Sequence, residues 1–107
     1  MMDQKPPIDI TLQHWQMVKE ILDNNVPEYD VYAFGSRVTG KARPYSDLDL
    51  VIMTERPLGI KKSASLSGDF SESDLPWKVD VIDWATTSES FRKIIEEKKV
   101  LLKKVTA

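Results

Sequence analysis

The spacing of apolar residues along the chain predicts three helices. A recurrence every three or four residues predicts an amphipathic helix over 11–24, on the positions Leu12, Trp15, Val18, Ile21 and Leu22. Asp9 or Thr11 is its expected N-cap. A second helix, weakened by glycine and serine, is expected over 58–70. Phe91, Ile94 and Ile95 predict a last helix that begins after a cap at Thr87 or Ser88.

Short apolar runs between these helices predict strands. We expect strands over 31–34, 47–53 and 79–82, and a short terminal strand over 100–102. Residues 36–46 are rich in turn-forming residues, and the first few are expected to form at most a helical turn. Helices that alternate with short strands predict an α/β (α+β) fold, in which helices flank a small mixed β-sheet.

Length and composition limit the possible functions. The 107 residues are expected to form one domain, with a loose leader over 1–9. The net charge of −2 makes nucleic acid an unlikely partner. Because the chain has no cysteine and one histidine, a bound metal is expected to have oxygen ligands. Without an apolar run long enough to span a membrane and without a signal-peptide pattern, the chain is expected to be cytoplasmic.

Two aspartates interrupt the second predicted strand. Asp47 and Asp49 have the same parity, so their side chains point to one face of the sheet, roughly 6.5–7 Å apart along the strand. Two carboxylates this close repel each other, and a divalent cation such as Mg²⁺ or Mn²⁺ would offset the repulsion. The alternative is that they are solubilising acids or turn caps at the edge of a strand.

A third aspartate lies in the next predicted strand. Asp80 and Asp83 have opposite parity, so only one of them faces the site. We expect Asp80 to be that residue because it lies between two valines, and we expect Asp83 to cap a turn. Three carboxylates on two adjacent strands can hold two metal ions for phosphoryl or nucleotidyl transfer.

Gly35 and Ser36 end the first predicted strand. A glycine at this position lets the backbone approach a ligand closely. Ser36 and the amides that follow it could bind a phosphate. The alternative is an ordinary turn at the end of a strand.

Taken together, these residues resemble a known family. Gly35-Ser36, ten further residues and Asp47-Leu48-Asp49 match the G-S-x₁₀-D-x-D signature of the polymerase-β-like nucleotidyltransferases. The segment Ser71–Trp77, which precedes Asp80, looks like that of the stand-alone minimal nucleotidyltransferases (MNT). The resemblance covers roughly residues 10–102, and no motif position departs from the pattern.

The resemblance implies a nucleotidyltransferase fold, with ATP and Mg²⁺ (or Mn²⁺) as cofactors. It implies that Gly35 and Ser36 bind the triphosphate, that Asp47 and Asp49 bind metal, and that Asp80 binds a second metal and helps to deprotonate the attacking hydroxyl. Arg37 is either a phosphate contact or a solvated turn arginine. The members of this family pair with a helical-bundle HEPN protein as toxin and antitoxin, and the MNT transfers AMP to a tyrosine of the toxin.

Two other functions compete with this one. The chain could be an antitoxin that neutralises its partner by contact alone, with a vestigial site. An antibiotic-modifying enzyme is less expected, since 107 residues leave no room for a substrate domain. Trp77 and Trp84, near the third strand, are aromatic candidates for a partner interface, and Trp77 is also a candidate for lining the nucleotide site.

Overall fold

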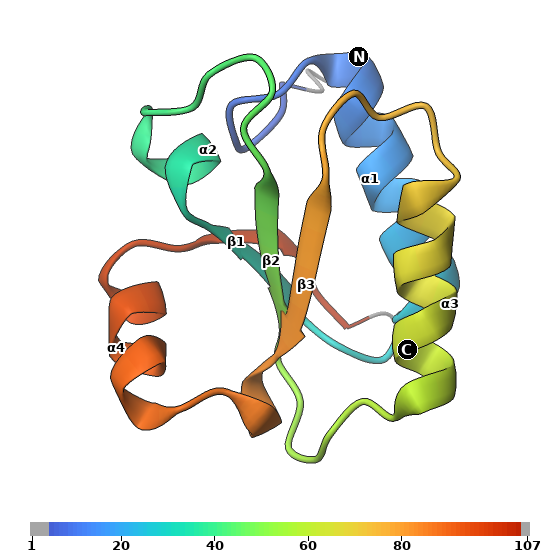
Figure 1. The fold of residues 1–107 in the computed structure, drawn as a ribbon, viewed down its shortest axis with the longest axis vertical. Coiled ribbons are helices and arrows are strands. Elements are labelled where there is room, and N and C mark those ends of the chain that lie inside the picture. Colours follow the sequence, from blue (N-terminus) through green and yellow to red (C-terminus); the bar gives the residue numbers. More distant parts are fainter. Residues whose placement is uncertain (1–4, 106–107) are drawn as a thin grey trace.

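The four strands form one mixed sheet in a computed structural model that describes residues 5–105. The strands are β1 (Val31–Phe34), β2 (Leu48–Ile52), β3 (Val79–Asp83) and β4 (Val100–Lys103), in the order β3-β2-β1-β4 (Figure 1). β1 pairs antiparallel with both β2 and β4, whereas β2 and β3 are parallel. The predicted mixed sheet is therefore confirmed.

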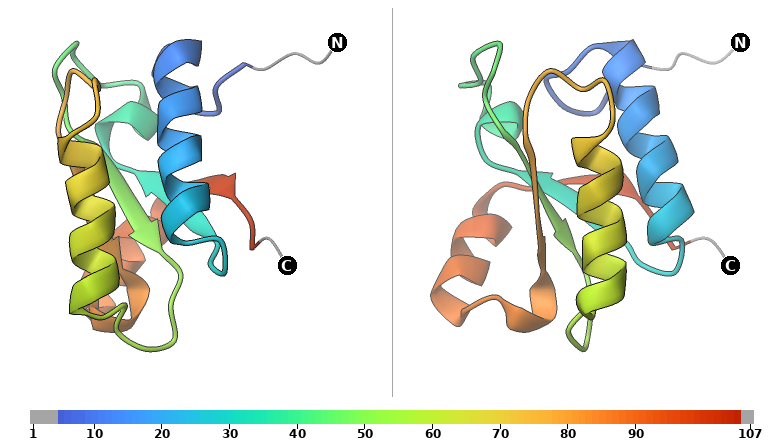
Figure 2. Two further views of the ribbon diagram at one scale, coloured as in Figure 1. Left: turned by 90° about the vertical axis from the view of Figure 1, so that its right-hand side faces the viewer. Right: turned by 45° about the vertical axis from the view of Figure 1, so that its right-hand side comes forward.

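Two long helices cover one face of this sheet, and a shorter helix lies on the other. α1 (Leu12–Asn25) and α3 (Ile60–Ser71) lie side by side, and α4 (Glu89–Glu97) lies across the sheet from them (Figures 1 and 2). α2 (Ser36–Thr39) is the helical turn after β1, and the 3₁₀ turn η1 (Trp84–Thr86) follows β3. Each predicted helix and strand is confirmed to within about two residues at its ends. Thr11 is the N-cap of α1 and Ser88 is the N-cap of α4, and each side chain accepts a hydrogen bond from a backbone N–H group in the first turn.

The core lies between the sheet and the pair α1 and α3. Alternate strand residues face it, as the two-residue period of a strand requires. The fully buried members on β1 and β2 are Val31, Ala33, Leu48, Leu50 and Ile52, and they pack with Trp15, Val18, Leu22, Leu66 and Phe70 from the helices.

The opposite face is covered more sparsely. Val51 and Ile95 are buried there, away from the main core cluster. The Phe91 ring of α4 meets the Phe34 ring of β1 edge to face at 5.8 Å. The next residues of the face, toward β3, are the aspartates of the candidate site.

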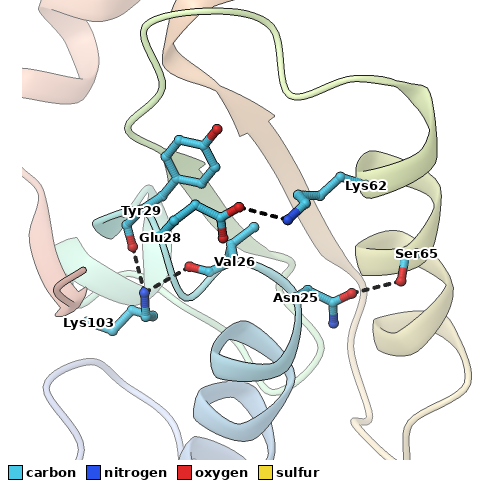
Figure 3. Close-up of polar contacts among 7 residues, drawn as sticks. All are labelled: Asn25, Val26, Glu28, Tyr29, Lys62, Ser65 and Lys103. Carbon is cyan, nitrogen blue, oxygen red and sulfur yellow. Dashed lines mark hydrogen bonds and ion pairs between the residues drawn. The ribbon is translucent and has the colours of Figure 1, made fainter. Parts of the chain in front are cut away.

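Polar contacts fix the connection between α1 and β1 (Figure 3). The buried amine of Lys103 on β4 donates to the carbonyls of Val26 and Tyr29, at 2.9 and 2.6 Å. Beside it, two contacts with α3 join Asn25 to Ser65 and Glu28 to Lys62, both at 2.8 Å. The carbonyls that follow the end of α1 are thus satisfied by a strand distant in sequence.

The segment before α1 is held in place. Ile8 is only 8% exposed and belongs to the core cluster, and the Asp9 N–H donates to the carbonyl of Arg37 at 3.0 Å. The prediction of a loose leader over 1–9 is therefore wrong for these two residues, because the apolar side chain of Ile8 is buried. Residues 1–4 lie outside the described residues. In the part of the chain that is described, no helix has the length and apolar character needed to cross a membrane.

Candidate active site

The pairing of β2 with β3 brings two of the predicted acids together. In the parallel register, Asp49 lies directly opposite Asp80, and on its other side Asp49 lies opposite Phe34 of β1. Neighbouring strands are about 4.8 Å apart, so the two carboxylates extend from adjacent positions on one face. Asp47 precedes β2 by one residue and is exposed, whereas the sequence predicted it inside the strand.

The acids interact electrostatically. Burial raises the pKa of Asp49, and the charges of Asp80 and then Asp47 raise it further. Asp80 has one compensating neighbour, the exposed Lys78, whose Nζ lies 3.4 Å from its Oδ1. The ionised form of Asp49 is therefore disfavoured until a cation approaches.

The chemistry of these side chains suits a hard divalent cation, although the acids are not gathered around a point. Carboxylate oxygens are the ligands that Mg²⁺ and Mn²⁺ prefer. Within residues 5–105, no three acidic or histidine side chains lie close enough together to hold a metal ion. The carboxylates repel one another, which keeps them apart, and a bound cation would offset this repulsion. The donor set of Asp47, Asp49 and Asp80 therefore fits such a metal.

Gly35 contacts the acid at the centre of this group. Its φ of +85° and ψ of −158° lie in a region that is almost restricted to glycine. A Cβ added there would lie 3.3 Å from the Asp49 Cγ and closer still to Oδ2. We predicted that this glycine admits a ligand. The structure gives a different reason for it, namely that the Asp49 carboxylate already occupies the space.

Ser36 begins α2 directly after this glycine. The turn is closed by its own backbone, since the Gly35 carbonyl accepts from the N–H groups of Val38 and Thr39, at 3.0 and 3.1 Å. The half-buried Ser36 hydroxyl makes no hydrogen bond with any other residue of the described chain. Ser36 therefore has a free polar group close to the acids.

Arg37 is placed differently from either prediction. Only 6% of it is exposed, its guanidinium donates to main-chain carbonyls, and its Cζ lies 4.6 Å from the centroid of the Trp77 ring. The prediction that Arg37 is a solvated arginine in a turn is therefore wrong. The predicted phosphate contact is not supported either, because carbonyls occupy the fork that would bind a phosphate.

The two tryptophans near β3 differ in their exposure. Trp77 is only 8% exposed and lies beneath Arg37, so it is not an exposed anchor for a partner. It does line a cavity of about 370 Å³ beside β3, together with Lys78 and Asp80. Trp84 is half-buried, beneath the guanidinium of Arg92.

Asp83 caps a turn, as its position on the opposite face from Asp80 predicted. It caps η1, accepts the Leu58 N–H at 2.7 Å, and accepts two hydrogen bonds from Thr86. Burial alone would raise the pKa of Asp83, but these hydrogen bonds hold it below its usual value. The choice of Asp80 as the acid that shares a face with Asp49 is therefore confirmed.

This combination of fold and site defines a class of protein. A mixed sheet with two aspartates in register on parallel strands, beside a glycine-serine turn, is the arrangement of a nucleotidyltransferase. Residues 16–106 match the family described as "Polymerase beta, Nucleotidyltransferase". The chain is also 55% identical, over 95 residues, to the probable protein adenylyltransferase MntA of Haemophilus influenzae, covering 89% of this chain and 83% of that protein. The chain therefore belongs to the polymerase-β-like nucleotidyltransferases, and among them to the MNT enzymes.

Several solved structures with the same fold come from toxin–antitoxin complexes. A toxin–antitoxin structure with AMP-PNP contains a chain with a TM-score of 0.71 and 22% identity, and the match covers 84% of this chain and 73% of that one. A complex of a tri-AMPylated HEPN toxin with an MNT antitoxin from Shewanella oneidensis gives a TM-score of 0.65 and 22% identity, covering 86% and 71%. At this identity the likeness establishes the fold alone.

Proposed function

We propose that this chain transfers AMP from ATP to a hydroxyl group on a partner protein. The observation that carries the proposal is its 55% identity, over most of both chains, to a probable protein adenylyltransferase. The paired acids beside the Gly35 turn support it, because Asp49 and Asp80 can supply metal ligands and Asp49 lies against the glycine that precedes Ser36.

The roles of the residues follow from their positions. We propose that Asp47, Asp49 and Asp80 hold Mg²⁺ or Mn²⁺, and that Gly35 and Ser36 receive the triphosphate. The metal would neutralise phosphate charge as the transfer proceeds. The acceptor oxygen forms a bond to the α-phosphorus, the bond from that phosphorus to pyrophosphate breaks, and Asp80 accepts the hydroxyl proton. Asp80 is suited to this step because it is half-exposed on the open face.

We propose a tyrosine of a helical HEPN toxin as the acceptor, with this chain as the antitoxin in the cytoplasm. The solved complexes with this fold are toxin–antitoxin pairs, one of which contains an AMPylated HEPN protein. The described chain has its core on one face of the sheet and leaves the acids on the other. The acceptor protein therefore has to supply much of its own binding surface.

The test uses the purified chain and a candidate HEPN partner protein. The pair is incubated with ATP and Mg²⁺, and the partner is weighed by intact-mass spectrometry. We expect the mass of one or more AMP groups on the partner, and no addition with Asp47→Asn. A pair that binds tightly while no nucleoside triphosphate adds mass would favour the antitoxin that acts by contact alone.

A further inference from the structure

Arg37 is a buried arginine without a carboxylate partner among the described residues. It lies on α2, directly after Gly35 and Ser36. Burial lowers the pKa of its guanidinium, and the charge of Asp9 partly offsets this. Burying a charged side chain costs folding free energy unless its donors are hydrogen-bonded. The acceptors that Arg37 binds therefore indicate its role.

Most of these donors hold one turn. Nε and Nη2 both donate to the carbonyl of Ser46, at 3.0 and 2.9 Å, and Nη2 also donates to the carbonyl of Pro44 at 3.0 Å. The turn is closed on itself, because the Ser46 N–H donates to the Arg43 carbonyl and the Arg43 N–H donates to the Ser46 hydroxyl. The guanidinium of Arg37 therefore binds a turn that is also held by its own internal hydrogen bonds.

The residue after this turn is Asp47. Its preceding peptide carbonyl, that of Ser46, is held by Arg37. Its following residue, Leu48, donates its N–H to the Lys78 carbonyl at 2.9 Å, next to β3. The backbone of the exposed Asp47 is thus held on both sides, although its side chain has no hydrogen-bond or ion-pair partner within residues 5–105.

The same guanidinium also fixes α2. Its Nη1 donates to the Asp9 carbonyl at 2.9 Å, and the Asp9 N–H donates back to the Arg37 carbonyl at 3.0 Å. The Trp77 ring supports the guanidinium from one side, at 4.6 Å. One side chain therefore joins the element that carries Ser36 to the turn that delivers Asp47.

We infer that Arg37 is a positioning residue for the metal site, acting through Asp47 and without contact to the nucleotide. The inference rests on the proposed function, which assigns metal binding to the acids. A lysine cannot replace the fork, since one ammonium group cannot bind the Ser46 and Asp9 carbonyls with the geometry of a planar guanidinium. Groups that hydrogen-bond a metal ligand directly typically contribute a factor of about 10–100 in metal affinity, and we take this range as the expectation for Arg37, which acts through the adjacent Ser46 carbonyl.

The test measures Mn²⁺ binding to the isolated chain by electron paramagnetic resonance, with no partner and no transfer reaction. Arg37→Lys is made in the wild-type chain and in Asp47→Asn. We expect Arg37→Lys to weaken Mn²⁺ binding about 10–100-fold in the first background. We expect no further loss in the second, because the ligand through which Arg37 acts is then absent.

Arg92→Lys is the matched control. Arg92 also lies over a tryptophan, 4.7 Å from the Trp84 ring, and donates from Nε and Nη2 to a main-chain carbonyl, that of Trp84. It lies on α4, and its guanidinium binds the carbonyl of Trp84 and not the turn that precedes Asp47. We expect Arg92→Lys to leave Mn²⁺ binding unchanged. Thermal melts without metal verify that each variant folds.

Equal losses from Arg37→Lys in both backgrounds, or an equal loss from Arg92→Lys, would overturn the inference while leaving the metal site intact. If Arg37→Lys does not fold, Arg37→Gln takes its place. If neither folds, Arg37 determines the fold, and a separate positioning role is overturned. Wild-type protein that binds no Mn²⁺ removes the metal site and this inference with it. The expected Mn²⁺ pattern without AMP transfer contradicts the proposed function alone.

Discussion

Replacing Gly35 with alanine should destabilise the fold in two ways. The new residue would have a strained backbone conformation, and its Cβ would clash with the Asp49 side chain. Gly35, with φ of +85° and ψ of −158°, and Gly59, with φ of +96° and ψ of 154°, lie in the same glycine-favouring region of backbone conformation. Alanine in this region costs about 1–3 kcal/mol of folding free energy from backbone strain. An added Cβ at Gly59 meets nothing within 4 Å, whereas at Gly35 it meets the Asp49 carboxylate.

The clash adds a second cost at Gly35 alone. Extra volume in a well-packed core costs about 1–3 kcal/mol, and the lower end applies here because the half-exposed Asp49 carboxylate can move aside. We therefore expect Gly59→Ala to lower the free energy of unfolding by about 1–3 kcal/mol, and Gly35→Ala to lower it by about 2–4 kcal/mol. Urea unfolding in metal-free buffer measures both. Gly35→Ala should also weaken Mn²⁺ binding, because the carboxylate it displaces is a proposed ligand, and Gly59→Ala should not.

A double variant identifies the source of the difference. Asp49→Ala removes the carboxylate that the new Cβ would meet, so Gly35→Ala in that background should cost no more than Gly59→Ala does in the wild-type chain. Equal costs for the two glycine variants in the wild-type chain would refute the clash. A Gly35→Ala cost that stays unchanged in the Asp49→Ala background would refute it as well.

Three further variants test the electrostatics and the polar contacts. Because the raised pKa keeps Asp49 protonated to higher pH in the folded than in the unfolded state, wild-type stability without metal should fall as pH rises from the ordinary aspartate pKa through the raised one. Asp49→Asn should flatten that decline in urea melts and abolish stabilisation by Mg²⁺; a large loss of metal-free stability would instead indicate a structural carboxylate. The pKa of Asp83 is lowered in the folded state, so the stabilisation that Asp83 contributes should be lost as pH falls through the folded-state pKa. Asp83→Asn should remove this pH dependence and leave Mn²⁺ binding unchanged. Lys103→Met should lower the free energy of unfolding by about 1–3 kcal/mol, since it leaves the carbonyls of Val26 and Tyr29 without their donor, and an unchanged urea midpoint would contradict this.

Side-chain periodicity accounts for what could be predicted from the sequence. The spacing of apolar residues is set by which face each element buries, so it predicted the three long helices and the four strands, whereas the short turn η1 was not predicted. The same two-residue period distinguished Asp80 from Asp83, and the structure places the first opposite Asp49 and the second on the cap of η1. These are local properties, and they do not depend on which strands become neighbours.

The contacts that could not be predicted depend on long-range pairing. Gly35 meets Asp49 because β1 and β2 pair with Phe34 opposite Asp49, a register that neither strand specifies alone. Arg37 follows a glycine-serine turn, where a positive charge suggests phosphate. Its actual partners reach it only because the 43–46 turn folds back over α2. Ile8 lies next to two prolines that suggest a loose segment, and only the packed core shows where its side chain is buried.

The distribution of apolar surface leaves the acids accessible to the proposed metal ion. Most of the core lies on the α1 and α3 face of the sheet, while α4 on the other face buries Ile95 and leaves Ile94 59% exposed. Asp49 and Asp80 are therefore half-exposed, and water still solvates their charges. Deeper burial would raise the pKa of Asp49 further, and a protonated carboxyl is a poor metal ligand. The shallow face limits this rise but cannot exclude water from a reaction. If the proposed function holds, the acceptor protein supplies the missing cover at the moment it presents its hydroxyl, and a protein acceptor then suits this small chain better than a free small molecule.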